Sequence, residues 1–255
     1  LIVVLEETGR SLVPSPLVST VIAARAIERF GSEAQRARWL PGLADGSRIG
    51  TFAWLERSDR LDPAGVEATA KVDGDRLVLS GEKRFVTDAS SADLFVVGVR
   101  TGSAPEAVSL VVVGKDASGV STDDYEGMDL TKRIGRLRLD EVRVEADCVL
   151  GELGAGAAAA GWLLDLGAAL VTAEAVGAAE AALRITSEFA KQRVQFDQPI
   201  GRFQGVKHPL AEIYVDVESF RSLVYYAIWA IDQDAEDASL AVSRAKAYCA
   251  EAFPR

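Results

Sequence analysis

The chain has 255 residues, a formal net charge of −10, 49% hydrophobic residues and 26% charged residues. This length can bury one large core or two moderate ones, and the composition is that of an ordinary globular protein. Nucleic acids and anionic membranes bind clustered Lys and Arg, so the acidic balance argues against either as the main partner and is explained by a solvated surface.

The first region, residues 1–48, is predicted to be helical. Hydrophobic residues recur at helical spacing over 17–27, and Gly31 follows as a C-terminal cap. The Ser-Glu-Ala-Gln stretch at 32–35 has the pattern of a capping box, in which the Ser and Gln side chains satisfy each other's backbone amides. The helix that begins there is expected to end at Pro41.

The second region, residues 49–152, is predicted to be β-rich, because short hydrophobic or alternating runs are separated by turn residues. These runs are 66–72, 76–80, 93–100 and 107–113, with turns predicted at 73–75 and at Gly81. Residues 137–139 and 142–144 alternate in opposite phase, which predicts a turn or bulge near Asp140 and Glu141. Short strands at this spacing are typical of a sandwich or barrel.

The third region, residues 153–255, is predicted to be helical again. Its hydrophobic residues at alternating steps of four and three are Val206, Leu210, Ile213, Val217, Phe220, Val224 and Ala227. This seam indicates a long helix in a bundle, with Pro209 in its first turn or at a kink. The Ala-rich stretch 168–190 permits close helix approach. Helices, then strands, then helices predict an α+β fold.

Neither a targeting segment nor a membrane span is predicted. The first residues lack the basic stretch and cleavage site of a signal peptide. The most membrane-like stretch, 154–183, is rich in Ala and Gly and is interrupted by Asp165, Glu174 and Glu180. We therefore expect a cytoplasmic protein.

Cysteine and histidine are scarce. Cys148 and Cys249 form neither a disulfide framework nor a CxxC site, and reduced thiols are expected. The single histidine, His208, precedes Pro209 and is expected near a helix start rather than as a general base. No His or Cys cluster exists for a transition metal, so no metal site is predicted.

Two segments invite a cofactor interpretation. Gly151 to Gly156 suggests a dinucleotide loop, but Ala159 stands where the third Gly is needed and no βαβ unit surrounds it, which favours a flexible inter-domain connection. Residues 193–204 place an Arg beside a Gln and an aromatic residue between two helices. Such a set can clamp a diphosphate and pack on a flat ring, whereas the alternative is a plain helical hairpin with a solvated Arg.

Several motifs together resemble the acyl-CoA dehydrogenase superfamily. Residues 31–46 are similar to the family's stretch that leads to its middle domain, and 140–156 to the segment that closes the β domain. The sequence Gly-Glu-Lys-Arg-Phe-Val-Thr-Asp-Ala at 81–89 resembles the family motif GxKxWIT(N/D). Residues 193–212 resemble RxQFGxPIxxFQxxxHxLA. The resemblance runs from end to end and is specific only when these motifs are taken together.

This resemblance implies an acyl-CoA dehydrogenase-like fold and FAD as cofactor. The implied domains are a partial N-terminal helical domain (1–48), a middle β-barrel or sandwich domain (49–152) and an incomplete C-terminal helical bundle (153–255). The implied cofactor-binding residues are Phe52, Trp54, Leu55, Phe85, Val86, Thr87, Arg193, Gln195, Phe196, Phe203 and Gln204. The first six match segments beside the isoalloxazine ring, and the last five match contacts to the ADP half of an FAD held by a neighbouring subunit.

The chain departs from the family pattern at the implied cofactor and substrate sites. Leu55 replaces a Thr that bonds the flavin, and Phe85 replaces a Trp. The GSD loop that helps to bind acyl-CoA aligns without gaps to Arg-Leu-Asp at 60–62, and with a gap to Ser-Asp at 58–59. Asp197 replaces the Gly that follows the implied Phe196 contact.

No catalytic base is identified, and the catalytic residues are unknown. The position that carries a Glu in some family members matches Gly167, and the following Arg matches Ala168. Asp165 lies two residues away, on a different helix face. Other members carry the base near the C-terminus, whereas this sequence stops at Arg255. We expect a fragment or the product of a shortened gene.

The leading hypothesis is a FAD-dependent acyl-CoA dehydrogenase-like enzyme in fatty acid or lipid metabolism. In this family a Glu removes the α-proton of an acyl thioester while the β-hydride moves to the flavin. The implied partners are an acyl-CoA substrate, an electron-transferring flavoprotein and further subunits of a homo- or hetero-oligomer, a dimer or tetramer. Three alternatives stay open: a non-catalytic subunit that donates Arg193 to a partner's FAD, a flavin-dependent oxidase or monooxygenase, and a binding module without flavin.

Overall fold

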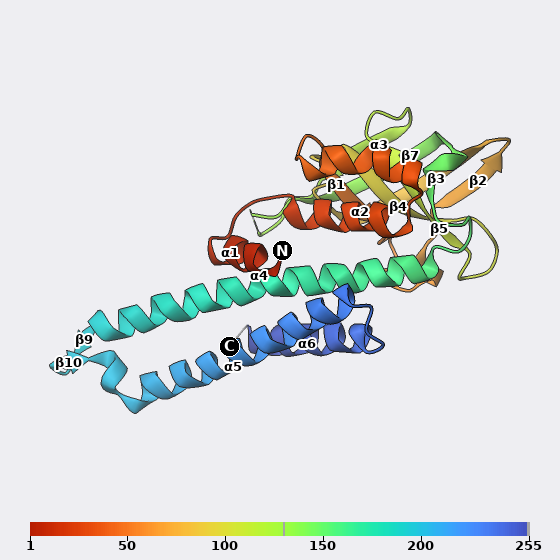
Figure 1. Ribbon diagram of the computed structural model, residues 1–255. Helices are drawn as coiled ribbons and strands as arrows, with labels where there is room; N and C mark the ends of the chain where they lie inside the picture. The colour runs from red at the N-terminus through yellow and green to blue at the C-terminus, as the bar shows by residue number, and fades with distance from the viewer. Residues whose placement is uncertain (130, 254–255) are drawn as a thin grey trace. The chain divides into compact units, whose positions relative to one another are not determined.

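The computed structural model describes residues 1–129 and 131–253, which form two compact units (Figure 1). Unit 1 consists of Leu1–Val13 and Asp165–Arg255, and unit 2 of Pro14–Leu164. Helices come first along the chain, then strands, then helices again. The predicted α+β organisation is therefore confirmed.

Unit 2 begins with two helices, α2 (Leu17–Phe30) and α3 (Glu33–Ala44). The predicted capping box is present: the Gln35 amide donates to Ser32 Oγ at 3.3 Å, and the Ser32 amide donates to Gln35 Oε1 at 2.7 Å. The prediction that α3 ends at Pro41 is wrong. Pro41 lacks only its own N–H, and its carbonyl still accepts from the Asp45 amide at 3.0 Å.

Eight strands form the sheet of unit 2, in the order β6-β7-β3-β2-β4-β5-β8, with β1 paired parallel to β4. The strands are β1 (Gly50–Ala53), β2 (Thr69–Asp73), β3 (Arg76–Thr87), β4 (Leu94–Arg100), β5 (Val108–Gly114), β6 (Val120–Asp124), β7 (Ile134–Glu145) and β8 (Val149–Leu150). Short 3-10 turns lie at Pro63–Gly65 and Ala146–Cys148.

The bulge predicted near Asp140 and Glu141 is confirmed. The β3–β7 register steps from Leu79↔Val142 to Gly81↔Leu139, and Glu141 has φ 50. The predicted turn at Gly81 is wrong, because Gly81 lies inside β3 with φ 147. A side chain there would bring its Cβ within 2.5 Å of Ala68 Cβ, so glycine serves close strand approach rather than chain reversal.

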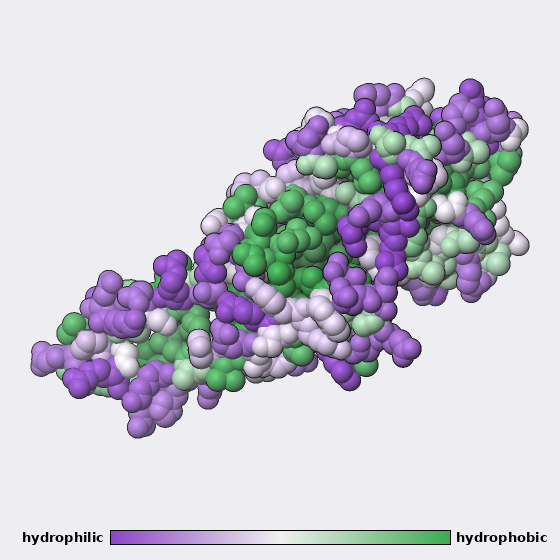
Figure 2. Space-filling view, viewed as in Figure 1, coloured by the Kyte–Doolittle hydropathy of each residue, from purple (hydrophilic) through white to green (hydrophobic). Residues whose placement is uncertain are grey.

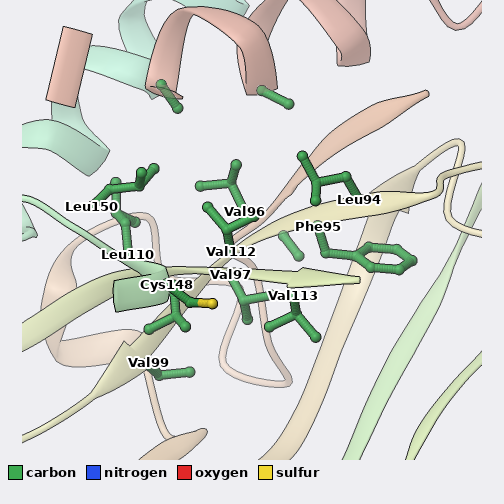
Figure 3. Close-up of a cluster of buried hydrophobic side chains, with 14 of the residues drawn as sticks. Leu94, Phe95, Val96, Val97, Val99, Leu110, Val112, Val113, Cys148 and Leu150 are labelled. Carbon is green, nitrogen blue, oxygen red and sulfur yellow. The ribbon is translucent and has the colours of Figure 1, made fainter. Parts of the chain in front are cut away.

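The core of unit 2 lies around β4 and β5 (Figure 3). Both strands are hydrophobic runs without alternation, and Leu94, Phe95, Val112 and their neighbours are buried. Helix α2 covers this part of the sheet and contributes Ala26 and Ile27 to the same cluster. Burial on both faces explains why these runs lack the polar positions of a half-exposed strand.

Unit 1 is helical. It contains α1 (Ile2–Arg10), most of α4 (Ala157–Gln192), α5 (Gln204–Asp232) and α6 (Ala238–Ala252). A short hairpin of β9 (Val194–Gln195) and β10 (Gln198–Pro199), followed by a 3-10 turn at Ile200–Arg202, joins α4 to α5. Figure 2 shows a hydrophobic surface around α1, where Val3 and Val4 are exposed.

The predicted long helix is α5. The second half of its seam is buried, at Val217, Phe220, Val224 and Ala227, whereas the first half is only partly buried. Pro209 lies inside α5 beyond the first turn, so the first of its two predicted places is wrong, and the second, a kink at Pro209, stays a prediction.

Helix α4 is long and apolar enough to cross a membrane by length and composition, a test that the core helix of a soluble protein also passes. Its Leu163, Leu166, Leu170 and Val176 are buried, as expected of a core helix.

Helices α1 and α4 approach each other through glycine. A Cβ at Gly177 would lie 1.8 Å from the Glu6 carbonyl oxygen, and a Cβ at Gly9 would lie 1.8 Å from the Glu174 carbonyl oxygen. Glu180 on α4 then pairs with Arg10 of α1 at 2.9 Å and with Arg221 of α5. Backbone contact and a shared carboxylate therefore fix α1 on the bundle.

We predict that Gly177→Ala destabilises the protein by about 1–3 kcal/mol, because the added methyl group overlaps backbone that cannot rotate away. Chemical unfolding followed by circular dichroism measures the loss. Gly161→Ala is the matched control on the same helix. A Cβ at Gly161 meets no atom within 4 Å, so this change should raise stability by about 0.5–1 kcal/mol. Equal effects of the two substitutions would contradict the close-packing explanation.

Candidate functional site

The ends of β1 and β3 lie side by side and bring together six of the predicted site residues. The Arg84 amide donates to the Leu55 carbonyl at 2.8 Å, and Thr51 Oγ1 donates to the Thr87 carbonyl at 2.7 Å. The segment 52–55 is thereby tied to the segment 85–87. The structure thus assembles Phe52, Trp54, Leu55, Phe85, Val86 and Thr87 in one place, as the resemblance implied.

A second bulge turns Phe85 outward. The β3–β7 register steps from Lys83↔Leu137 to Val86↔Gly135, which leaves one extra residue on β3. Phe85 has φ 51 and its side chain is 53% exposed, with its ring 5.6 Å from that of Tyr125. Bulges commonly re-aim a side chain beside an active site, and here the bulge presents a flat aromatic face to solvent.

The neighbours of Phe85 differ in what they can offer a ligand. Thr87 is partly exposed at the end of β3, whereas the Val86 side chain is buried and leaves only backbone. Phe52 is partly exposed and stacks on Trp54, with ring centroids 5.9 Å apart. Trp54 is buried, donates through Nε1 to the Leu61 carbonyl at 2.9 Å, and packs against Gly98. Trp54 therefore supports Phe52 from behind.

A buried ion pair beneath this place was missed by the sequence reasoning. Lys83 Nζ donates to Glu56 Oε1 at 2.5 Å and to the Trp54 carbonyl at 3.2 Å. The Glu56 carboxylate also accepts from the Glu67 and Ala68 amides. Desolvation lowers the pKa of Lys83, while the negative charge of Glu56 acts in the opposite direction and raises it. The sequence holds one signal for this burial: Lys83 falls on the same alternating positions of β3 as Leu77 and Leu79, whose side chains face inward.

Asp88 directly follows Thr87 and links β3 to α2. Its Oδ2 accepts from Ser19 Oγ at 2.6 Å, and its amide donates to the Arg133 carbonyl at 2.8 Å. Asp88 has φ 56, a conformation that Asp tolerates better than most residues. Burial raises the pKa of the Asp88 carboxyl, with the Ser19 hydrogen bond and the cations at 132 and 133 acting in the opposite direction.

The other predicted site residues lie in unit 1, around the β9–β10 hairpin. Phe196 and Asp197, with φ 51 and 62, form its two-residue turn. Phe196 is 85% exposed, and its ring meets that of Phe203 edge to face at 6.0 Å. Among the described residues Arg193 has no ion-pair partner, and its backbone carbonyl accepts from the Ile200 amide at 2.8 Å. Gln195 and Gln204 are also exposed at this end of the bundle.

Each group has a chemistry that fits one part of FAD. The first offers aromatic faces and a hydroxyl to a planar ring system, and the second offers an exposed guanidinium, amides and an aromatic ring to a diphosphate and a flat base. Within the described residues no group of three or more His, Cys, Asp or Glu could hold a metal ion. Gly167 and Ala168 lie within α4, so the expected catalytic position of that helix carries no side chain able to move a proton.

Comparison with protein families matches three models, each to one part of the chain. The acyl-CoA dehydrogenase N-terminal domain matches residues 1–47, the middle domain matches 51–142, and the C-terminal domain matches 154–255. A short-chain-specific acyl-CoA dehydrogenase of Megasphaera elsdenii is 33% identical over 87% of this chain and 58% of its own length. A probable acyl-CoA dehydrogenase of Bacillus subtilis is covered over 62% of its length, so the chain spans about three fifths of such relatives.

Solved structures agree in fold. A protein described as a FAD-dependent dehydrogenase has a TM-score of 0.91 and 32% identity, and the match covers 99% of this chain and 70% of that one. A steroid ACAD named for Tcur3481 and Tcur3483 together has a TM-score of 0.85 and 36% identity, with 99% of this chain and 66% of that chain covered. The whole described architecture is therefore shared with known dehydrogenases.

We predict that Asp88→Asn changes the pH dependence of stability. The folded state binds the Asp88 proton more tightly than the unfolded state, because burial raises the pKa in the folded chain. The stability that Asp88 contributes is therefore complete below its ordinary pKa of 3.8 and is lost as the pH rises through the higher folded-state value. Relative to Asp88→Asn, the wild type should lose stability as the pH rises.

Urea unfolding of both proteins at a series of pH values from about 3.5 to 7 measures this difference, since other carboxylates titrate in both. Asp116→Asn, at an exposed aspartate, is the control and should follow the wild type. A constant difference between the wild type and Asp88→Asn across this range would show that Asp88 has the same pKa folded and unfolded.

Proposed function

Because this chain belongs to the acyl-CoA dehydrogenase family, we propose that it binds FAD and takes part in the α,β-dehydrogenation of an acyl-CoA thioester. The observation that carries the proposal is the bulge in β3, which presents Phe85 beside Thr87 and the end of β1. We further propose the domain division 1–48, 49–152 and 153–255. Cytoplasmic location, a role in fatty acid or lipid metabolism, and assembly as a homo- or hetero-oligomer belong to the same proposal.

The residues have distinct roles in this proposal. FAD, when bound, supplies the redox chemistry by accepting a hydride from the substrate β-carbon. Phe52 and Phe85 border its ring system, the Thr87 hydroxyl bonds it, and the Leu55 side chain excludes water from it. At the hairpin, Arg193 and Gln195 hold the diphosphate of an FAD bound by a neighbouring subunit, while Phe196, Phe203 and Gln204 pack around the adenosine half of that FAD. An electron-transferring flavoprotein is the proposed acceptor of the electrons.

The proposal is tested by visible absorbance of the purified chain, alone and after titration with FAD. A flavin spectrum that bleaches anaerobically with an acyl-CoA is the expected result. A chain that is colourless as purified and takes up no FAD on titration would contradict flavin binding and favour a binding module. Oxygen consumption without acyl-CoA turnover would instead favour an oxidase or monooxygenase on the same fold.

A specific observation favours a second candidate, the non-catalytic subunit of a heteromeric dehydrogenase. Gly167 leaves the family's catalytic position on α4 without a carboxylate, while Arg193 is exposed and has no ion-pair partner among the described residues. The structural relative named for two proteins together also fits this candidate. Coexpression with a base-carrying homologue encoded nearby separates the two functions. A flavin spectrum and turnover that appear only in the coexpressed complex support the heteromer, whereas full activity of the isolated chain excludes it.

We predict that Arg193→Gln weakens FAD binding by about tenfold or more, since a charge-assisted hydrogen bond to phosphate contributes about 1.5–3 kcal/mol. Titration of the apoprotein, or of its complex with the partner, with FAD measures the change. Arg184→Gln, at an exposed arginine on α4, is the matched control and should bind FAD as the wild type does. Equal affinities of the two variants would remove Arg193 from the proposed diphosphate contact.

A further inference from the structure

The buried Glu56–Lys83 pair is an unusual use of charge in the core of unit 2. Lys83 is among the largest of the side chains that are less than 2% exposed, and the side chains of Lys83 and Glu56 are 0% and 5% exposed. Desolvation of two charges offsets most or all of their attraction, so such a pair is a poor way to add stability. The geometry of the pair is specific, however, because each of its hydrogen bonds joins a defined donor and acceptor in a fixed direction.

The pair ties together three segments that are separate in the sequence. Lys83 Nζ holds the Trp54 carbonyl at 3.2 Å, just after β1. The Glu56 carboxylate holds the Glu67 amide at 2.8 Å and the Ala68 amide at 3.0 Å, just before β2. Lys83 itself lies on β3. Both ends of the segment 57–66 are therefore held by one buried carboxylate, that of Glu56.

These segments are the ones that carry the first group of proposed site residues. Trp54 and Glu56 flank Leu55, whose carbonyl accepts from the Arg84 amide at 2.8 Å. Lys83 is the last paired residue of β3 before the bulge that exposes Phe85. The pair thus fixes the backbone on both sides of the place where β1 and β3 meet.

We propose that Glu56 and Lys83 are positioning residues for FAD, which hold the segments 52–55 and 85–87 in register without contacting the cofactor themselves. This inference rests on the proposed flavin function of those segments. Leu55 has no hydroxyl to bond a flavin, so the contacts on this side come from Phe85 and Thr87. The backbone of β3 sets where these two residues lie, and the buried pair holds that backbone in place. The hydrogen bonds of the pair itself go to the Trp54 carbonyl and to the Glu67 and Ala68 amides, and none goes to β4 or β5.

The test uses the double substitution Glu56→Gln/Lys83→Met, which keeps side-chain volume and leaves no buried charge unpaired. The double variant should unfold close to the wild-type midpoint, since neutral replacement of a buried pair is often tolerated. In the FAD-free protein, amide hydrogen exchange should become faster at Glu67, Ala68 and Arg84. Exchange along β4 and β5 should stay unchanged. FAD affinity should fall about tenfold, as expected for the loss of one positioning hydrogen bond.

A matched control lies on the same strands. Arg76 and Glu145 form an exposed pair across β3 and β7 at 3.0 Å, and both side chains are 52% exposed. Arg76→Gln/Glu145→Gln should change neither the local exchange nor FAD affinity. If the buried double variant does not fold, Glu56→Asp serves, because it keeps the charge of the pair while the carboxylate, shorter by one methylene, no longer reaches the Glu67 and Ala68 amides together with Lys83 Nζ.

Two results would overturn the inference. One is unchanged exchange at Glu67, Ala68 and Arg84, with FAD affinity equal to that of the wild type. The other is faster exchange spread evenly over β3, β4 and β5 with a lower unfolding midpoint, which would make the pair a stability element only. A wild-type chain that takes up no FAD, alone or with its partner, contradicts the proposed function instead. The exchange pattern of the FAD-free protein then decides by itself whether the pair sets these segments.

Discussion

Strand β4 is buried on both faces from Leu94 to Val99 and pairs with β1, β2 and β5. Because no polar side chain interrupts this run, the strand can only lie where other elements cover it completely. Figure 3 shows its side chains among those of β5. The parallel register of β1 on β4 sets Phe52 opposite Val96, so the position of the candidate site follows from the burial of β4.

Features of this fold that depend on neighbouring residues could be predicted from the sequence. The capping box at Ser32 and Gln35 is complete within one turn. The bulge at Glu141 follows from a change of phase within β7, and the run of β4 from its own hydrophobicity. The extension of α3 beyond Pro41 could not be predicted, because a proline near a helix end costs only its own missing N–H.

Features that depend on distant residues could not be predicted. A lysine in a strand ordinarily lies in solvent, and Lys83 is buried because Glu56, in the segment that follows β1, pairs with it. Gly81 has the local pattern of a turn residue, whereas its role is set by Ala68, just before β2. The family motifs predicted the residues of the candidate site. They did not predict the exposure of Phe85, which results from a bulge in β3 that no periodic pattern in the sequence indicates.

The departures of this chain from its family fall into two classes with different physical consequences. Asp197 replaces a glycine at a left-handed position, yet Asp tolerates φ 62, so the hairpin turn that carries Phe196 is kept. Phe85 replaces a larger aromatic residue and still presents a flat face. Leu55 and Gly167, by contrast, delete a hydroxyl and a carboxylate that no described neighbour restores at those positions.

The backbone turns that present the proposed cofactor contacts are therefore present, while a flavin-bonding hydroxyl is missing at Leu55 and a carboxylate is missing at Gly167. This combination gives the heteromeric candidate its physical basis: a subunit without a carboxylate at position 167 can still offer the exposed Arg193 to a partner's cofactor.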